Sequence, residues 1–380
     1  MWQGEDGHFG EMTVKGPIAH ALEKIGYSTP TPVQEQVIPL VRSGRDIIGQ
    51  AQTGTGKTAA FGIPLVESLD PKAQHLQALV LTPTRELAVQ VSDEISRLGQ
   101  FSGIRCVTVY GGQSMNQQLE SLKRGAHVIV ATPGRLMDHM GRRTVRLDRL
   151  GIVVLDEADQ MLDIGFAEDI ERILRATPRT RQTLLFSATM PGPIKTLANR
   201  YLNNPEWVRI GGDAEPVEQV EQLYYEIAAQ DRPAALDNLL GEPGNITQAL
   251  IFRRTKIGVD KLVRHLQRQN YDAEAIHGDM PQSRRESVMN RFRARKLRIL
   301  VATNVAARGL DIPAVSHVIN YDMPSNLEEY VHRIGRTARM GQPGTAITFV
   351  SDVLDFSTLD IIQAHVGSHL KQERMAFLYG

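Results

Sequence analysis

The sequence predicts an α/β protein made of two tandem domains, each built around a parallel sheet. Short apolar, β-rich runs alternate with longer amphipathic stretches, which is typical of parallel strands covered by helices. The alternation stops once, near 211–216, where residues become small, polar and turn-prone, and then restarts. With 380 residues and 42% hydrophobic content, the chain can form two cores. We expect one domain over 1–210, a linker over 211–217 and a second domain over 218–380.

The expected elements follow from the apolar spacing. The run 152–155 is continuously apolar and largely β-branched, as in a strand buried on both faces. The stretch 85–98 repeats apolar residues at the 3.6-residue helical period. The expected strands are 46–49, 78–82, 105–110, 127–131, 152–155 and 183–187, then 249–252, 273–277, 299–303, 316–320 and 345–350. Further helices are expected at 255–269, 282–293 and 353–370.

Composition limits where the protein works and what it binds. The formal net charge is zero, so any polyanion must be held by a local groove rather than by a global basic field. The single cysteine, Cys106, excludes an intrachain disulfide and favours a reducing, cytoplasmic location. Residues 1–10 lack the apolar segment of a signal peptide, and no run of about 18 apolar residues predicts a membrane span. A monomer is the default expectation.

The segment A-Q-T-G-T-G-K-T at 51–58 has the pattern of a phosphate-binding loop between a strand and a helix. Gly54 and Gly56 allow backbone N–H groups to close around phosphate oxygens. Lys57 can reach the outer phosphates, and the hydroxyl of Thr58 can ligate Mg²⁺. The pattern departs from the general one at Ala51, and such a stretch alone is also compatible with an ordinary turn. The expected nucleotide contacts here are Gln52, Thr53, Gly54, Thr55, Gly56, Lys57 and Thr58.

The segment D-E-A-D at 156–159 directly follows the expected strand 152–155. Carboxylates at the carboxyl end of a buried parallel strand lie where open α/β sheets bind ligands. Asp156 is expected to hold Mg²⁺, and Glu157 to orient and deprotonate the attacking water. A solvated acidic loop is the alternative for this segment alone, but its pairing with the phosphate loop favours a nucleotide site.

The second half carries H-R-I-G-R-T-A-R at 332–339. If this segment is helical, Arg333, Arg336 and Arg339 share one side, and His332 neighbours Arg336. Guanidinium groups stabilise charge on transferred phosphoryl oxygens. A solvated basic helix face is the alternative, but Gly335 inside the segment favours a close backbone approach. We expect the two halves to close over one nucleotide, with the phosphate loop from the first and the arginines from the second.

With these motifs in this order, the chain resembles the DEAD-box RNA helicases from about residue 9 to about residue 350. The resemblance implies two RecA-like domains, ATP and Mg²⁺ as cofactors, and RNA as partner. It implies that Gln34, in G-Y-S-T-P-T-P-V-Q at 26–34, hydrogen-bonds the adenine edge and that Tyr27 packs against its face. It also implies that Asp311 contacts the ribose. Asp159, Ser187, Thr189 and His332 would couple hydrolysis to strand separation.

The resemblance also implies a set of RNA contacts. Hydroxyls, backbone N–H groups and arginines hold phosphate and sugar without reading bases, and contact with 2′-hydroxyls favours RNA over DNA. Taken singly, the threonines and arginines are also compatible with helix caps and solvated positions. The implied RNA contacts are Pro83, Thr84, Arg85, Gly111, Gly112, Thr132, Pro133, Gly134, Arg135, Gln282, Arg285 and Thr303.

Three positions depart from the commonest family pattern: Arg254, Asn304 and Ala338. Asn304 and Ala338 remove no phosphate, metal or arginine ligand, and Arg254 places a bulky charged side chain where the family often has a smaller residue. The basic runs 142–149 and 291–298 are interpreted as solvated faces. The expected function is ATP-dependent opening of short RNA duplexes or remodelling of RNA–protein complexes. Two alternatives are an ATPase acting on DNA or protein, and a nucleotide-gated RNA clamp that barely unwinds.

Overall fold

The structure is a computed structural model that describes residues 5–51, 55–210, 220–241, 246–307, 312, 315–338 and 343–375. The chain divides into two compact units, Met1–Gly212 (unit 1) and Asp213–Gly380 (unit 2), which are described separately. The predicted linker 211–217 lies outside the described residues, so the exact domain boundaries stay predictions. No helix in the described ranges is long and apolar enough to cross a membrane.

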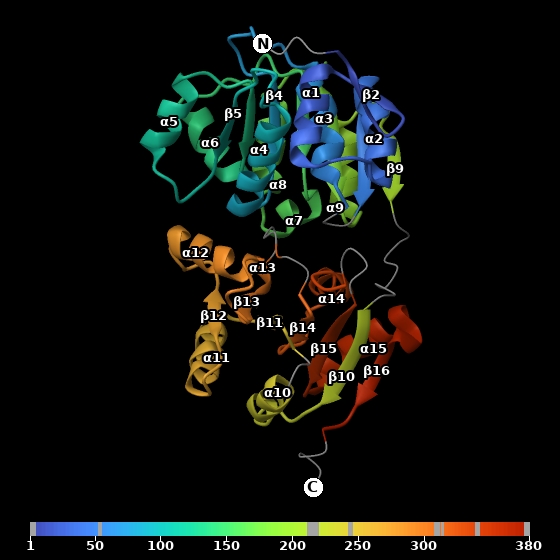
Figure 1. Ribbon diagram of the computed structural model, residues 1–380, viewed down its shortest axis with the longest axis vertical. Helices are drawn as coiled ribbons and strands as arrows, with labels where there is room; N and C mark the ends of the chain where they lie inside the picture. The colour runs from blue at the N-terminus through green and yellow to red at the C-terminus, as the bar shows by residue number, and fades with distance from the viewer. Residues whose placement is uncertain are drawn as a thin grey trace. The chain divides into compact units, whose positions relative to one another are not determined.

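Unit 1 contains a seven-stranded, fully parallel sheet in the order β5-β6-β4-β7-β8-β3-β9 (Figure 1). Its strands are β3 (Ile47–Ala51), β4 (Ala78–Leu81), β5 (Cys106–Val109), β6 (Val128–Ala131), β7 (Ile152–Leu155), β8 (Gln182–Ser187) and β9 (Glu206–Ile210). A hairpin of β1 (Gly7–Phe9) and β2 (Met12–Val14) precedes the sheet. The helices are α1 (Gly16–Ile25), α2 (Pro32–Arg42), α3 (Lys57–Ser68), α4 (Arg85–Leu98), α5 (Met115–Lys123), α6 (Pro133–Gly141), α7 (Ala158–Asp163), α8 (Ala167–Arg175) and α9 (Gly192–Tyr201).

The sheet of unit 1 is buried on both faces because side chains alternate between two hydrophobic cores. In β4, Val80 packs in the core formed with α1–α4, whereas Leu79 and Leu81 pack in the core formed with α6–α9. All four residues of β7 are buried in the same alternating way. Burial on both faces explains why these strands appear in the sequence as continuous apolar runs.

Unit 2 repeats this plan with a parallel sheet in the order β12-β13-β11-β14-β15-β10-β16. Its strands are β10 (Val220–Glu226), β11 (Ala249–Arg253), β12 (Ala273–Ile276), β13 (Ile299–Thr303), β14 (His317–Asn320), β15 (Gly344–Val350) and β16 (Leu370–Glu373). Its helices are α10 (Arg232–Gly241), α11 (Lys256–Arg268), α12 (Gln282–Arg293), α13 (Asn304–Ala307), α14 (Leu327–Ile334) and α15 (Val353–Val366), followed by a 3₁₀ turn (Gly367–His369).

The predicted fold class is confirmed, and each strand expected from the sequence is present. The expected helix 353–370 is too long, because the chain leaves the helix at Gly367, which has φ +60°, and then forms β16. The sequence analysis missed the hairpin and the strands β9, β10 and β16. Residues of β10 alternate between buried and partly exposed positions, so this strand lacks the continuous apolar run that revealed the others.

Gly49 in β3 generates a stability prediction. A Cβ at this position would overlap the buried ring of Phe186, which packs against Phe61 with ring centroids 5.4 Å apart. Gly49→Ala should therefore destabilise unit 1 by about 1–3 kcal/mol through overpacking. Thermal unfolding should show a lower Tm, whereas Gly141→Ala should not, because its Cβ would meet no neighbour within 4 Å. Equal Tm values for the two variants would contradict this packing.

Candidate functional site

The carboxyl edge of the unit 1 sheet gathers the nucleotide motifs. Strands β7, β8 and β3 are neighbours, and all three run parallel. Lys57 follows β3, Ser187 ends β8 and Asp156 follows β7. Segments about 130 residues apart in sequence are thus brought to one edge, where open α/β sheets bind ligands.

The described part of the phosphate loop has a backbone conformation that requires glycine. Gly56 has φ +92° and caps the N-terminus of α3, whose first residue, Lys57, is 6% exposed. Thr58 follows on the same helix. The carbonyl of Thr55 accepts a hydrogen bond from Oγ1 of Thr31 at 2.9 Å. The predicted contacts Gln52, Thr53 and Gly54 lie outside the described residues.

Asp156 and Glu157 form a buried acidic pair beside this loop. Burial raises the pKa of Asp156 to about 6, the charge of Lys57 opposes this shift, and the charges of Glu157 and Asp159 add to it. The N–H of Glu157 donates to Oδ1 of Asp156 at 3.1 Å. Glu157 itself has φ 52° and ψ 53°, a left-handed conformation that costs energy for a non-glycine residue. Strain and buried charge thus occur together at the residue predicted to handle the attacking water.

The donor set fits a magnesium ion. Mg²⁺ prefers carboxylate and hydroxyl oxygens, which Asp156 and Thr58 supply from adjoining segments. The raised pKa of Asp156 shows that burial penalises its ionised form. A cation would offset this penalty.

Asp159 fixes the S-A-T segment that ends β8. Its Oδ2 accepts from the N–H of Ala188 at 3.1 Å, the N–H of Thr189 at 2.9 Å and the hydroxyl of Thr189 at 3.0 Å. The N–H of Asp159 donates to Oγ of Ser187 at 3.3 Å, and Ser187 donates to the carbonyl of Thr189. These bonds connect the acidic motif to the S-A-T segment in one network, within unit 1.

The segment predicted to contact adenine is anchored at two places. Gln34 is buried at the N-terminus of α2, where Oε1 accepts from the N–H of Thr31 at 2.8 Å and Nε2 donates to the carbonyl of Gly56 at 3.2 Å. Tyr27 is 37% exposed and donates its hydroxyl to Oε1 of Glu94 at 2.8 Å. Burial and this hydrogen bond raise the pKa of Tyr27 to about 12, so it stays a neutral aromatic.

The predicted RNA contacts of unit 1 lie at the same edge, after β4, β5 and β6. Thr84 caps α4 by accepting from the N–H of Leu87, and Thr132 and Pro133 begin α6. The guanidinium of Arg85 lies against Gly112, where any Cβ would overlap it. The remaining members of this group at the edge are Pro83, Gly111, Gly134 and Arg135, the last of which lies 3.8 Å from Asp138.

The structure describes fewer of the predicted RNA-binding and nucleotide-binding residues in unit 2 than in unit 1. Thr303 ends β13, and Arg285 is buried on α12. Gln282 begins α12, but its side chain, like Asp311 and Arg339, lies outside what the structure describes. Their roles stay predictions.

The prediction that the arginine motif is one helix is wrong. Helix α14 contains His332 but ends at Ile334; Gly335 is its C-terminal cap, and Arg336 is buried in the turn that follows. Thr337 then pairs with Val315 in an isolated bridge, so Arg336 does not continue the helix that carries Arg333.

Arg333 is a core residue of unit 2. It is 2% exposed, and its guanidinium donates to Oδ1 of Asn320 at 3.0 Å and to the carbonyl of Asp322 at 2.9 Å. It also donates to Glu329 and lies 4.8 Å from the ring centroid of Phe252. This arginine positions α14 against the sheet.

Three supporting residues were not identified from the sequence. Thr31 carries a signal that could have found it, because T-x-x-Q at 31–34 is a capping box. Asp322 also follows a strand, and its carboxylate accepts from the N–H of Arg254 at 2.7 Å and from the side chains of Arg232 and Arg253. Glu94 carries no such signal, because its partner, Tyr27, is distant in sequence.

The departure at position 338 has a structural consequence. Ala338 has φ 50° and is buried. Glycine adopts this left-handed conformation without steric cost, whereas alanine does not. The structure gives no explanation for Asn304, and the side chain of Arg254 is exposed.

Comparisons with known proteins place the chain in a family that carries these motifs. Residues 31–197 match the DEAD/DEAH box helicase family, and residues 231–341 match the helicase conserved C-terminal domain. The DEAD-box ATP-dependent RNA helicase CshA of Bacillus licheniformis is 48% identical over 343 residues, covering 90% of this chain and 70% of that protein. CshA of Bacillus subtilis is 47% identical, with 90% and 69% covered. The structure of S. cerevisiae Dbp5 bound to RNA and ADP BeF3 matches with a TM-score of 0.85 and 33% identity over 95% of this chain and 94% of that one.

Gly56 generates a prediction for the phosphate loop. A Cβ there would lie 2.7 Å from Nε2 of Gln34 and 3.0 Å from Oγ1 of Thr31, at a φ of +92°. Gly56→Ala should therefore distort the loop and weaken ATP binding by roughly tenfold in calorimetric titration. Gly44→Ala is the matched control, with φ +77° and no neighbour within 4 Å. Equal ATP affinity in both variants would show that the loop tolerates the change.

Proposed function

Because this chain belongs to the DEAD-box family of ATP-dependent RNA helicases, we propose that it uses ATP to open short RNA duplexes and remodel RNA–protein complexes. One observation carries the proposal: the residues proposed to bind ATP follow β3, β7 and β8, and those proposed to bind the RNA backbone follow β4, β5 and β6, at the same edge of the sheet. A single edge can therefore hold ATP and RNA side by side.

Unit 1 supplies the groups that bind and hydrolyse ATP. Lys57 would hold the outer phosphates, while Thr58 and Asp156 would hold Mg²⁺, which when bound neutralises phosphate charge. Glu157 orients the attacking water and accepts its proton. Gln34 and Tyr27 hold the adenine, and the phosphate loop includes Gln52, Thr53, Gly54, Thr55 and Gly56.

Unit 2 would supply positive charge to the same reaction. Arg336 and Arg339 would stabilise the phosphoryl oxygens in the transition state, and Asp311 would contact the ribose. Asp159, Ser187, Thr189 and His332 would transmit the nucleotide state to the RNA-binding residues. Support within unit 1 comes from the hydrogen bonds that join Asp159 to the S-A-T segment.

Hydroxyls, glycine backbone and arginines at the strand ends would hold one RNA strand by its phosphates and riboses. Each opened base-pair step costs roughly 1.4 kcal/mol, so one binding event opens a few pairs rather than a long duplex. If ATP and RNA favour the same state of the protein, each must tighten binding of the other by the same factor.

A nucleotide-gated clamp uses the same residues, so a separate assay distinguishes it from a helicase. Strand displacement from a short tailed duplex should require hydrolysable ATP for repeated rounds. A clamp would hold RNA in the presence of ATP but release no strand. A cytoplasmic location and a monomeric state stay predictions, to be tested by cell fractionation and by sedimentation.

Two substitutions separate nucleotide binding from chemistry. Lys57→Ala should weaken ATP binding itself, because it removes the charge that holds the phosphates. Glu157→Gln should keep ATP affinity but lower kcat by roughly 10²–10⁴-fold, because it removes the general base. It should also accumulate on RNA in the presence of ATP, as measured by co-sedimentation. Wild-type turnover in either variant would refute the assigned role.

Stimulation of ATPase activity tests the nucleic-acid class. RNA should raise kcat and lower the apparent KM for ATP, whereas DNA of the same sequence should do so less, because it lacks 2′-hydroxyls. Titration of both ligands at one fixed salt concentration gives the comparison. An ATPase rate unaffected by RNA, or equally stimulated by DNA, would overturn the proposed RNA dependence.

A further inference from the structure

A second basic surface lies at the opposite edge of the unit 1 sheet. In a parallel sheet, the loops that precede the strands meet at the amino edge, away from the catalytic motifs. Three such loops, before β5, β6 and β7, carry basic side chains, most of them in the loop before β7. We call this group the amino-edge surface; its basic members are Arg105, Lys123, Arg124, Arg142, Arg143, Arg146 and Arg149.

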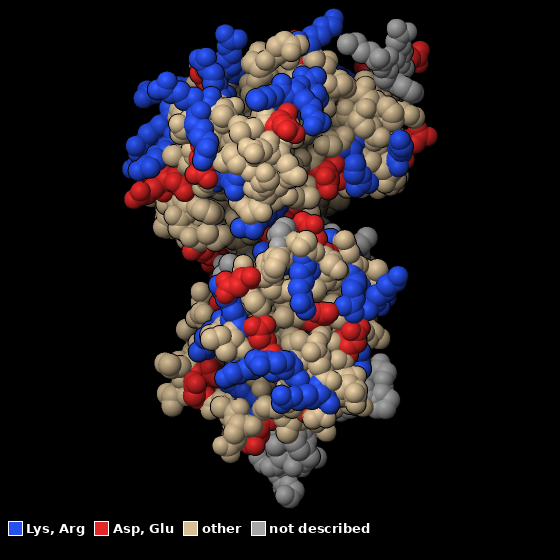
Figure 2. All heavy atoms as spheres, turned by 90° about the vertical axis from the view of Figure 1, so that its left-hand side faces the viewer, with Lys and Arg blue, Asp and Glu red and all other residues tan. Residues whose placement is uncertain are grey.

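These charges are exposed and mostly uncompensated. Arg146 forms an ion pair with Asp148 at 3.3 Å, but the two side chains are 83% and 54% exposed, so water screens the pair. Arg105 donates to the carbonyl of Gly125, which neutralises no charge. Within the described ranges no carboxylate pairs with Arg142, Arg143 or Arg149. Figure 2 shows Lys and Arg side chains gathered at the upper end of unit 1, with few acidic side chains among them.

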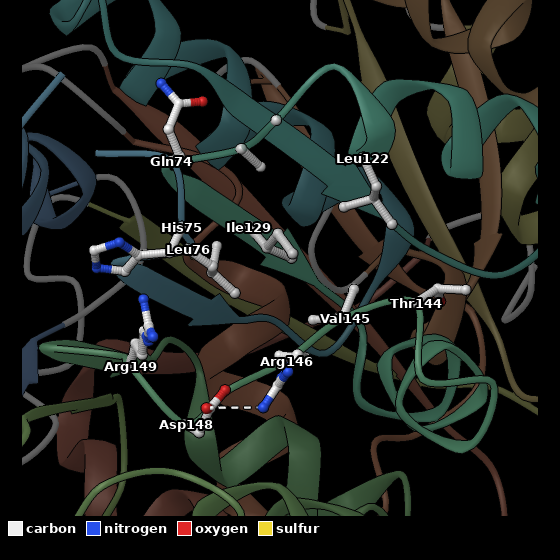
Figure 3. Close-up of a pocket in the computed structure, with 12 residues that line it drawn as sticks. Gln74, His75, Leu76, Leu122, Ile129, Thr144, Val145, Arg146, Asp148 and Arg149 are labelled. Carbon is white, nitrogen blue, oxygen red and sulfur yellow. Dashed lines mark hydrogen bonds and ion pairs between the residues drawn. The ribbon is translucent and has the colours of Figure 1, made fainter. Parts of the chain in front are cut away.

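A cavity opens within this surface. Its volume is about 400 Å³, large enough for one nucleobase with its sugar. Figure 3 shows the apolar side chains of Leu76, Ile129 and Val145 in the centre, with His75 and Arg149 to their left and the Arg146–Asp148 pair below them. The cavity therefore combines an apolar floor with a cationic rim. Gln74 also lines the cavity, and its amide offers a donor and an acceptor that could meet the edge of a base.

We propose that the amino-edge surface binds single-stranded RNA that extends beyond the segment held at the carboxyl edge. The arginines would pair with successive phosphates, and one unpaired base would occupy the cavity. This inference rests on the proposed RNA-dependent function. It deepens that function by adding a second RNA site on the same unit.

Chemistry favours an RNA strand over other anions. A phosphodiester chain presents repeated negative charges, which suits several arginines spread over three loops better than a single small anion does. Guanidinium groups also stack on bases, so Arg149 at the cavity rim can contact both parts of a nucleotide. A base paired in a duplex could not enter the cavity, and so the strand must be single.

The separation of the two edges makes the proposal dependent on RNA length. Strand β6 has 4 residues and spans about 13 Å at 3.3 Å per residue, with loops adding to this distance at both ends. An RNA just long enough to fill the carboxyl edge cannot reach the amino edge. Only a longer strand can use both sites at once.

The test compares Arg146→Glu/Arg149→Glu with wild type by fluorescence anisotropy, using single-stranded RNAs of roughly 8 and roughly 24 nucleotides. The double variant should bind the long RNA about tenfold more weakly and the short RNA unchanged. Loss of two phosphate contacts should also reduce the slope of log K against log salt by about 1.4 for the long RNA, at about 0.7 per contact. The matched control is Lys261→Glu/Arg264→Glu, which makes the same change of charge at exposed positions on α11 of unit 2, away from the amino-edge surface.

Each other result overturns the proposal. Unchanged affinity for the long RNA would mean that the surface serves another partner, such as an acidic protein or a lipid surface. Equal losses for both RNAs, or an equal loss in the control variant, would indicate a general charge effect. Photo-crosslinking of 4-thiouridine RNA gives an independent readout: the long RNA should label the peptide containing 144–149, and absence of that label would also overturn the proposal. Short-RNA stimulation of the ATPase should be normal in the double variant; its absence in wild type as well would refute the proposed function instead.

Discussion

In each unit, parallel strands are hydrogen-bonded side by side and covered by helices on both faces. This arrangement forces every loop that leaves a strand to emerge at one edge of the sheet. Lys57, Asp156 and Thr189, which follow β3, β7 and β8, therefore lie at one edge without any long loop reaching across the molecule. The same rule delivers the preceding loops to the other edge, where their charges gather for the same geometric reason. Whether a loop follows or precedes a strand thus decides at which edge of the sheet its residues lie.

The nucleotide edge keeps its charged groups in an unfavourable environment when no ligand offsets it. Asp156 is buried among other acids, and Glu157 has a left-handed backbone. Such features persist only where neighbouring structure holds them in place. Here the support comes from the buried strand β7 and from Asp159, whose carboxylate accepts hydrogen bonds from the adjoining segment. A phosphate-bound cation beside Asp156 would relieve the cost of its buried charge.

The sequence was sufficient for the buried strands because burial on both faces leaves a continuous apolar run such as 152–155. It was insufficient for β10, whose alternation resembles an exposed segment, and for the arginine motif. In the arginine motif the three-residue spacing fits a helix. The burial of Arg333, however, depends on hydrogen bonds to Asn320 and Asp322, which lie near it only in the folded sheet. Local sequence patterns predict local secondary structure, whereas hydrogen bonds between distant segments can be identified only once the fold is known. The catalytic and RNA-contact assignments themselves remain predictions from motif resemblance.

The amide of Gln34 illustrates how such bonds can set specificity. A glutamine amide has two N–H groups and an oxygen with two lone pairs. One lone pair already accepts from Thr31 and one N–H already donates to Gly56, so the amide cannot rotate by half a turn without losing both. What remains is one donor and one acceptor in a fixed order. Adenine presents the complementary acceptor N7 and donor N6, whereas guanine presents two acceptors. If Gln34 contacts the base as proposed, this fixed order of donor and acceptor would favour adenine over guanine before either binds.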